Sequence, residues 1–345
     1  MNKFLVAILL CTATLLAEKD DFDLLMGKNS PHWAHVGQPE DIQALFRYKQ
    51  LYDRQKELRH LKAAAVKIPK VVHFIWLGPR SFPGESVHNV RTWMAQNPDW
   101  TFKFWTDRPR DPPCHGMETI LIKEYPFALG RCYAASENWG EKSDVLRFEI
   151  LYHQGGVYVD HDANCLQPFE NMHGAYDFYC GLEAPHPLVV GLNITAGNGV
   201  IGSRPGHPVV KQVIDLIDRR WEELAKKYPD KDGYSRTQIV MERTYLALTL
   251  ALREKLDFPG NSDIVLPAAY FFAKPGIKPL YSQHFFANSW AKDSNAADFE
   301  KGTQKILNKL DMKLRRTLVV VGIFLSFNLL LIAFGIIFSK KRKLI

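Results

Sequence analysis

The chain has 345 residues, enough for one large or two small domains, and its 46% hydrophobic content is that of an ordinary globular protein with a sizeable core. Its formal net charge is +7, but residues 313–345 hold seven Lys and Arg and no acid, so residues 1–312 are neutral overall. The basic isoelectric point is therefore a property of the C-terminal tail. No basic, aromatic-interleaved patch of the kind that binds nucleic acid is evident, and no nucleic-acid partner is expected.

The first 17 residues have the pattern of a secretory signal peptide. Lys3 precedes an apolar run that ends at Ala17, and residues 1–17 are followed at once by acidic residues. An uncleaved anchor is the alternative, although the run is short for a membrane span. Residues 18–66 are predicted to form a stem that begins as an acidic loop and continues with helical composition from residue 41.

Residues 67–312 are predicted to form an α/β domain. Strands alternate with helices along this stretch, which is typical of a sheet covered by helices. The expected strands are residues 71–76, 102–105, 157–159, 178–182 and 199–201, and the expected helices are residues 143–154, 209–224 and 243–256.

The segment from residue 143 to residue 162 carries the candidate chemistry. Asp144 and Arg147 are three positions apart and therefore share one face of the expected helix. The glycine pair that follows ends this helix, because glycine tolerates the left-handed conformation found at helix C-termini. The apolar strand after it ends at Asp160 and Asp162, which alternate around one residue and so point to the same side.

Two carboxylates on one side of an extended chain suit Mg²⁺ or Mn²⁺ that is shared with substrate phosphates. Taken alone, two aspartates around one residue usually mark a solvated strand end, and an Asp–Arg pair one turn apart is usually a surface ion pair of little energetic value. The combination is rarer than its parts. The sequence therefore predicts a divalent-metal site at Asp160 and Asp162, with Asp144 and Arg147 beside it.

The whole segment resembles the signature of the DXD-containing sugar-nucleotide glycosyltransferases. The pattern S/A-D-x-x-R-x-x-x-L-x-x-x-G-G-x-Y-x-D-x-D is complete from Ser143 to Asp162, with Leu151 at its leucine position. This family includes fungal Golgi mannosyltransferases, inositolphosphoceramide mannosyltransferases and, more distantly, the glucosylating toxins of clostridia. The resemblance covers roughly residues 67–292. It implies the Rossmann-like fold called GT-A, a nucleotide-diphosphate sugar as donor, and retention of the anomeric configuration.

The resemblance also implies roles for residues of this segment. Asp144 and Arg147 match the residues that grip hydroxyl groups of the donor hexose. Asp160 matches a carboxylate that touches the ribose and the metal, and Asp162 one that binds the metal directly. Tyr158 is a candidate donor contact, with a simple strand position as the alternative.

Further positions outside the segment match the family's pattern. Trp76, at the end of the first strand, corresponds to a tryptophan that lies against the nucleobase, and a core tryptophan is the alternative. Ser289 and Trp290 resemble a closing loop that covers the metal and the diphosphate. Asn198 and His284 are assigned to the acceptor side, where a glycine-rich loop before a helix is the alternative for Asn198.

The C-terminal region has the pattern of a membrane anchor. Residues 317–338 form an uncharged run of 22 residues, about 33 Å long as a helix and enough to cross a bilayer. The basic cluster in residues 339–345 favours a cytoplasmic tail and a luminal catalytic domain. The chain is thus expected to be a single-pass membrane protein of the Golgi or endoplasmic reticulum. Four cysteines remain after the signal, an even number that allows three disulfide pairings, and Asn193 begins the one glycosylation sequon.

These features predict a metal-dependent hexosyltransferase with Mn²⁺ or Mg²⁺ as cofactor. It is expected to move a hexose, with mannose as one candidate, from a UDP- or GDP-sugar to a glycolipid or to the glycan of a membrane glycoprotein. Two other classes fit the same carboxylates. One is a metal-dependent phosphohydrolase, and the other is a non-catalytic, membrane-anchored module that binds glycans.

Overall fold

A computed structural model describes residues 20–61, 65–125, 127–187, 192–229, 233–257 and 259–292, together with the single positions 312 and 317. The segments expected as signal peptide, as transmembrane helix beyond Thr317, and as basic tail lie outside these residues. Within the described ranges, none of the helices combines the length and the apolar character that a bilayer crossing requires.

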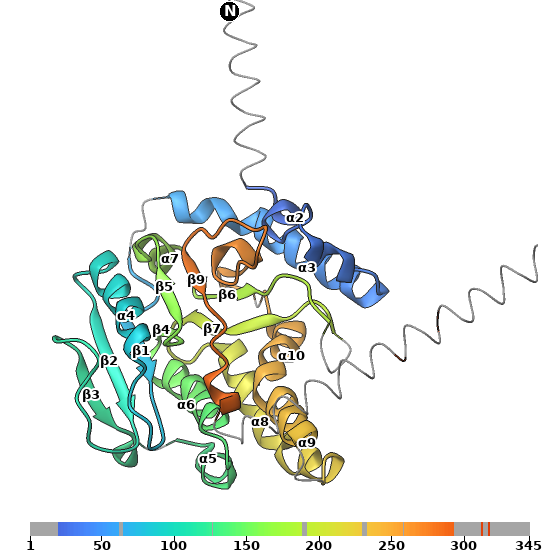
Figure 1. Cartoon of the computed structure of the whole chain (residues 1–345). Coiled ribbons are helices and arrows are strands. Elements are labelled where there is room, and N and C mark those ends of the chain that lie inside the picture. The colour runs from blue at the N-terminus through green and yellow to red at the C-terminus, as the bar shows by residue number, and fades with distance from the viewer. Residues whose placement is uncertain are drawn as a thin grey trace, which may run out of the picture.

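A seven-stranded mixed sheet forms the centre of the protein (Figure 1). In spatial order it consists of β3 (Glu118–Leu121), β2 (Thr101–Thr106), β1 (Val71–Ile75), β4 (Gly156–Val159), β7 (Ala196–Ser203), β6 (Phe178–Leu182) and β8 (Asp263–Leu266). In this described sheet β7 alone runs antiparallel to its neighbours, while the other pairs are parallel. The predicted α/β class is confirmed, and each of the five expected strands falls on a strand of this sheet.

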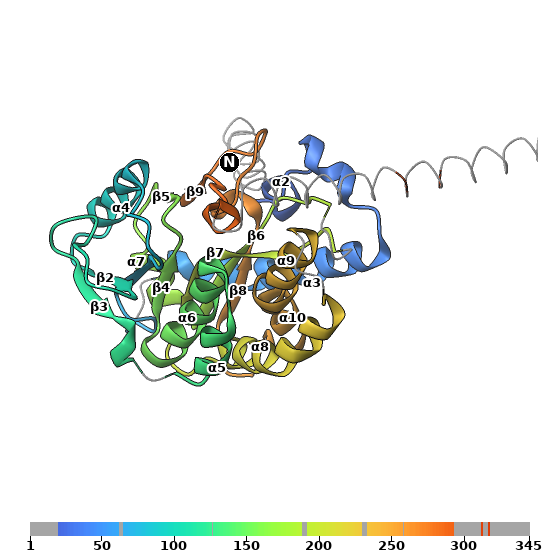
Figure 2. The same ribbon diagram turned by 60° about the horizontal axis from the view of Figure 1, so that its bottom comes forward.

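Three helices lie together on one side of the sheet (Figure 2). The first, α6 (Trp139–Gln154), packs against β1, β4 and β7 and also against α8 (Pro208–Lys227), which in turn packs against α10 (Leu246–Lys255). The helices expected from the apolar spacing of residues 209–224 and from the motif are confirmed as α8 and α6. The one expected at residues 243–256 divides into a π-helical turn, η4 (Met241–Tyr245), and α10.

The other helices cover the remaining parts of the sheet. One of them, α4 (Gly84–Gln96), packs on β5 (Ala163–Cys165), which pairs with β9 (Ser282–His284) in a small second sheet. Helix α3 (Pro39–Gln55) packs on β8. The short helices are α2 (Phe22–Leu25), η1 (Pro31–His35), η2 (Lys56–His60), η3 (Ile122–Glu124), α5 (Gly130–Ala135), α7 (Glu170–Ala175), α9 (Gly233–Val240), η5 (Ala268–Tyr270) and η6 (Ser289–Lys292).

The N-terminal segment expected as a stem packs onto the domain. Within the described residues it contains α2, η1, α3 and η2, and its role as a stem stays a prediction. Phe22 and Tyr52 are fully buried in the same core as the sheet residues, and the Tyr52 hydroxyl lies 3.1 Å from that of Tyr270. The apolar core is therefore continuous across residue 67, where the domain boundary stays a prediction.

The four cysteines of the described residues are all buried and free, so none of the three possible disulfide pairings is formed. Asn193 of the sequon donates its side-chain amide to Asp41 Oδ2 at 2.8 Å. This contact ties the loop before β7 to the N-terminal end of α3.

The parallel order of the sheet breaks between β4 and β7. The carboxyl ends of β1 and β4 lie side by side there, and antiparallel β7 begins at the same edge. Just beyond β4 the N–H of Asp160 donates to the carbonyl of Gly199 at 2.8 Å. Ligands of open α/β sheets bind at such a switch in strand order, so a ligand-binding site is expected at this edge.

Candidate active site

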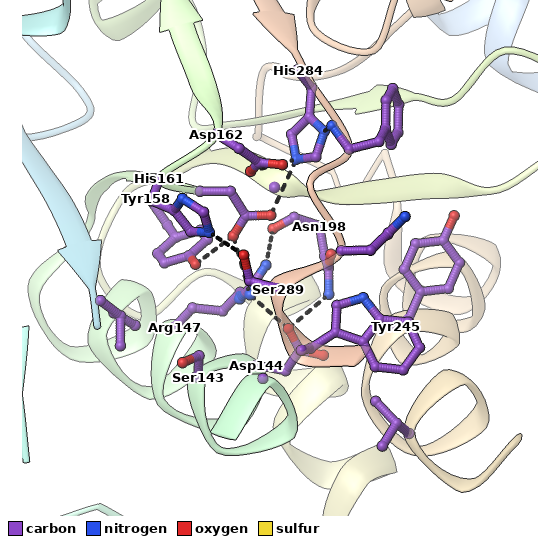
Figure 3. Close-up of a pocket in the computed structure, with 18 of the residues that line it drawn as sticks. Ser143, Asp144, Arg147, Tyr158, His161, Asp162, Asn198, Tyr245, His284 and Ser289 are labelled. Atoms are coloured by element: carbon purple, nitrogen blue, oxygen red, sulfur yellow. Dashed lines mark hydrogen bonds and ion pairs between the residues drawn. The ribbon is translucent and has the colours of Figure 1, made fainter. Parts of the chain in front are cut away.

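A cavity of about 560 Å³ opens at this edge of the sheet (Figure 3). Its walls come from segments far apart in the sequence: the end of β1, the first half of α6, the end of β4, the start of β7, the η4 turn and the segment after β9. The volume is that of pockets which enclose most of a small molecule.

Clear local signals begin and end α6. The side-chain oxygen of Asn138 caps its N-terminus and accepts the N–H of Glu141 at 3.0 Å. Gly155 follows its last residue with φ of 65°, which glycine adopts without strain. Between these ends, one turn brings Arg147 Nη2 to 2.6 Å from Asp144 Oδ1. The Asp–Arg pair expected on one helical face is therefore formed, and it is buried.

Arg147 is the electrostatic centre of the cavity wall. Beside its bond to Asp144, its Nη2 atom lies 3.3 Å from Asp160 Oδ1, and its Nη1 donates to the carbonyl of Asn198. The guanidinium also lies over the ring of Tyr158, 4.1 Å from the ring centroid. A buried charge is tolerated only when it is paired. Arg147 thus fixes the helix that carries Asp144 against the strand end that carries Asp160.

Asp160, Asp162 and His284 converge on one point, with one ligand atom from each within 4.8 Å of the other two. His284 Nε2 is 3.3 Å from Asp160 Oδ2 and 3.3 Å from Asp162 Oδ1. The protein holds the outer oxygens: the Tyr158 hydroxyl donates to Asp160 Oδ1 at 2.6 Å, and the N–H of Ala287 donates to Asp162 Oδ2 at 2.6 Å. The two inner oxygens, Asp160 Oδ2 and Asp162 Oδ1, face His284 and can bind one common cation.

This donor set fits a divalent cation. Two carboxylate oxygens and one imidazole nitrogen suit Mn²⁺, while Mg²⁺ favours the oxygens. Asp144 and Asp160 contact the Arg147 guanidinium, and Asp162 lies beside Asp160 and His284. With the three carboxylates ionised and His284 neutral, these groups carry an excess of two negative charges. The glycine at position 199 in β7 leaves space for these candidate ligands, because a Cβ there would lie 2.7 Å from Asp160 Oδ2 and 2.9 Å from His284 Nε2.

The charges of the site shift the pKa values of its groups in opposite directions. Burial raises the pKa of Asp160, but Arg147 and His284 outweigh burial and hold this pKa well below its usual value. Burial lowers the pKa of His284, and the neighbouring carboxylates reverse this, so the His284 pKa lies above 6.5. Burial raises the pKa of Asp144 in spite of Arg147. A proton on His284 and a cation at the carboxylates therefore compete for the same negative charge.

The segment after β9 lies over the cavity. Ser289 Oγ is 3.0 Å from His161 Nε2, and the guanidinium of Arg80 donates to the Ser289 carbonyl at 3.0 Å. Trp290 packs on the first turn of α6, where a Cβ on Gly140 would lie 2.1 Å from Trp290 Cβ. His161, the residue between the two aspartates, thus links their loop to the segment that covers it.

Trp76 lines the same cavity, but it is only 8% exposed. Its indole N–H donates to the Arg80 carbonyl at 2.8 Å. Its ring meets that of His161 edge to face, with the ring centroids 5.0 Å apart. Trp76 therefore supports the carboxylate loop and leaves a small part of its ring at the cavity wall.

The structure brings every residue singled out from the sequence to this cavity. They are Trp76, Asp144, Arg147, Tyr158, Asp160, Asp162, Asn198, His284, Ser289 and Trp290. Asn198 and His284, both assigned to the acceptor side, contact candidate donor and metal residues, and their acceptor role stays a prediction. The side-chain amide of Asn198 donates to Asp144 Oδ1 at 3.1 Å, and His284 joins the two carboxylates.

Comparison with known proteins indicates the class of enzyme. Residues 83–179 match the family described as glycosyltransferase sugar-binding region containing DXD motif. Inositol phosphoceramide mannosyltransferase 1 of Schizosaccharomyces pombe is 24% identical over 281 residues, 80% of this chain and 76% of that protein. Mannosyl phosphorylinositol ceramide synthase CSH1 of Saccharomyces cerevisiae is 29% identical over 150 residues, 44% of this chain and 35% of that protein. The chain is a glycosyltransferase, and its residues 83–179 resemble the DXD-containing family.

The DXD motif of this glycosyltransferase is Asp160-His161-Asp162, which lies inside the matched residues. The enzyme spans three quarters of its Schizosaccharomyces relative but about a third of the Saccharomyces protein. Among solved structures, the catalytic domain of alpha-toxin from Clostridium novyi is 12% identical, with a TM-score of 0.46 over 82% of this chain and 90% of that chain.

Sequence reasoning missed several residues of the enzyme's cavity. Glu183 follows β6 directly, and a carboxylate just past the carboxyl end of an expected strand is the signal that could have found it. It accepts a hydrogen bond from the Tyr245 hydroxyl at 2.8 Å, and its Oε2 lies 3.0 Å from His186 Nε2. Burial raises the pKa of Glu183, but these partners and Lys274 bring it down to about 2. Tyr245 carries no comparable signal, because an aromatic residue in a helical stretch reads as core.

Proposed function

We propose that this glycosyltransferase moves a hexose from a UDP- or GDP-sugar to an acceptor hydroxyl, with Mn²⁺ or Mg²⁺ held by Asp160, Asp162 and His284. One observation carries the proposal. A buried Asp144–Arg147 pair, suited to sugar hydroxyl groups, contacts a cation-binding group of three residues within a single cavity. A GT-A fold is part of the proposal and is supported by the mixed sheet with its site at the switch in strand order.

In this reaction the bond between the anomeric carbon and the diphosphate oxygen breaks and a bond from that carbon to the acceptor oxygen forms. The products are the glycosylated acceptor, the nucleoside diphosphate and the one proton that the acceptor hydroxyl releases. The bound cation supplies the positive charge that stabilises the leaving diphosphate. Asp144 accepts hydrogen bonds from the hexose, and Arg147 holds Asp144 and Asp160 in their relative positions. Ser289 and Trp290 cover the diphosphate and exclude water, and the edge of Trp76 meets the base. Retention of the anomeric configuration rests on the family resemblance.

The acceptor is proposed to be a glycolipid or a membrane glycoprotein, and mannose to be a candidate sugar. The name of the Schizosaccharomyces relative gives inositol phosphoceramide as the molecule on which it acts, and this supports a lipid acceptor. The apolar run at residues 317–338 and the N-terminal signal pattern support a single-pass protein of the secretory pathway. Its catalytic domain then lies in the lumen and its C-terminus in the cytoplasm.

The test uses the full chain in detergent with Mn²⁺ and a panel of UDP- and GDP-sugars. Thermal stabilisation reports donor binding, and released nucleoside diphosphate reports turnover. We expect one donor class to stabilise the protein and Asp162→Ala to abolish this effect. Asp215→Ala is the matched control, because that carboxylate is exposed on α8 and pairs only with Lys211 among the ion pairs of the described residues. Absence of binding by every donor, or equal behaviour of the two variants, would overturn the proposal.

A further inference from the structure

The η4 turn interrupts the helices beside the cavity. It is π-helical, and the N–H of Leu246 reaches back to the carbonyl of Met241, five residues earlier. Turns of this kind are rare and occur frequently at functional sites, because the extra residue changes which side chains face a given direction.

Residues of the turn contact α8 on one side and the cavity on the other. Glu242 binds Lys227 on α8 at 2.8 Å, and Arg243 donates to the carbonyl of Trp221 at 2.9 Å. Tyr245 reaches the cavity, where it contacts Glu183. These contacts tie the turn to α8 and to the segment after β6, on either side of the residue between Arg243 and Tyr245.

That residue, Thr244, has a fully buried side chain. Its hydroxyl lies 2.5 Å from Asp144 Oδ2 and 3.0 Å from the carbonyl of Val240. A hydroxyl has one proton to donate, and a bond to a carboxylate is the stronger of the two choices. The Thr244 hydroxyl therefore donates its hydrogen bond to Asp144 Oδ2.

The contacts of Asp144 show what this bond controls. Its Oδ1 atom accepts from Arg147 at 2.6 Å and from the Asn198 amide at 3.1 Å, while Oδ2 accepts from Thr244. A carboxylate has about four acceptor positions, so about one remains for a ligand. Rotation about the last bond of an aspartate is soft, and partners on both oxygens are needed to fix the carboxylate plane. Thr244 therefore decides where the remaining lone pair points.

We propose that Thr244 is a positioning residue that sets the orientation of Asp144 toward the donor hexose, so that the π-turn determines how the enzyme recognises its sugar. This inference rests on the proposed function, because it takes the ligand of Asp144 to be the hexose of a nucleotide sugar. It concerns the sugar half of the donor alone. The diphosphate and its cation would meet Asp160, Asp162 and His284, and none of these three accepts a hydrogen bond from Thr244 in the described part of the chain.

The test separates the two halves of the donor. The full chain with Mn²⁺ is titrated with the nucleoside diphosphate alone and with the matching nucleotide sugar, and kcat and KM are measured for transfer. Thr244→Val keeps the shape and removes the hydroxyl, whereas Thr244→Ser keeps the hydroxyl. We expect Thr244→Val to bind the diphosphate as the wild type does and the nucleotide sugar about tenfold more weakly, with a lower kcat. Thr244→Ser is expected to restore both, and discrimination between hexoses to fall in Thr244→Val alone.

Three outcomes would overturn the inference. Thr244→Val with wild-type affinity for the nucleotide sugar and wild-type kcat would show that the hydroxyl does not position Asp144. Equal losses for the diphosphate and the nucleotide sugar would mark a general disturbance of the fold, which thermal denaturation of the same samples would also detect. Failure of Thr244→Ser to recover would exclude the hydroxyl as the cause. A wild-type chain that binds no nucleotide at all would instead overturn the proposed function, and this inference with it.

Discussion

Gly199→Ala tests whether the two aspartates and His284 hold a cation. Gly199 lies in β7 opposite the carboxylate loop, and a methyl group there would lie 2.7 Å from Asp160 Oδ2 and 2.9 Å from His284 Nε2. Both distances are shorter than van der Waals contact, so both side chains must move. Gly199 is not among the glycines with positive φ, so alanine can adopt its backbone conformation and the effect is steric.

The effect of the methyl group on the stability of the fold is expected to differ from its effect on cation binding. The groups that must move are the ends of two side chains, so the fold can absorb the methyl for about 1–3 kcal/mol of unfolding free energy. A bound cation has less freedom, because its ligands must keep their distances and directions. Changes in the groups that orient metal ligands typically cost about 10- to 100-fold in metal affinity, and we expect a loss of that size here. The predicted signature is a large loss of cation binding with a moderate loss of stability.

Calorimetric titration of the full chain with Mn²⁺ measures the affinity, and thermal denaturation of the same samples measures stability. Gly130→Ala is the matched control, because a Cβ at that position on α5 has nothing within 4 Å. Wild-type Mn²⁺ affinity in Gly199→Ala would refute the reasoning. An equal loss in both variants would do so as well, since only one methyl meets the candidate ligands.

Two further predictions concern the cover of the cavity and the core. Gly140→Ala places a methyl 2.1 Å from Trp290 Cβ. This variant is expected to bind the nucleotide about tenfold more weakly in equilibrium titrations. Gly84→Ala is the control and should leave the affinity unchanged, because nothing lies within 4 Å of the new Cβ. Equal affinities in the two variants would contradict a role for Trp290 in covering the nucleotide. Low pH is expected to destabilise the fold, because burial lowers the pKa of His73 and of His173 from 6.5 to about 3. Between these values the unfolded chain binds more protons than the folded one, so the unfolding free energy falls with falling pH by up to about 1.4 kcal/mol per pH unit for each histidine. Denaturant unfolding at several pH values measures the slope, and an unchanged slope in His73→Gln would contradict the prediction.

Local patterns were sufficient for the part of the site that lies on one continuous segment. Helical spacing places Asp144 beside Arg147, and strand alternation places Asp160 beside Asp162, because both periodicities act over a few residues. The strand ending at residue 75 was visible for the same reason: a run of apolar and β-branched residues marks a buried strand wherever it occurs. These elements needed no knowledge of distant partners.

Local periodicity does not find residues that reach the site through long-range contacts, and His284 was singled out through the family resemblance alone. His284 meets the carboxylates because β9, a strand of three residues, pairs with β5 and sets His284 opposite Ala163. Three residues are too few to show a period. Thr244 depends on a π-turn that no sequence pattern announces. Phe22 and Tyr52 lie among many charged residues, so their burial against the domain is a property of the tertiary fold.

The partners of the individual oxygen atoms separate the proposed transferase from the alternatives. A phosphohydrolase that uses an aspartate as nucleophile needs a carboxylate oxygen free to attack. Here the outer oxygens of Asp160 and Asp162 are held by Tyr158 and Ala287, and both inner oxygens face the same nitrogen of His284. A calcium-dependent glycan-binding module would need about six to eight oxygen ligands, whereas this group offers an imidazole beside two carboxylates. The arrangement therefore favours carboxylates that hold charge in place, which is the role that departure of a diphosphate requires.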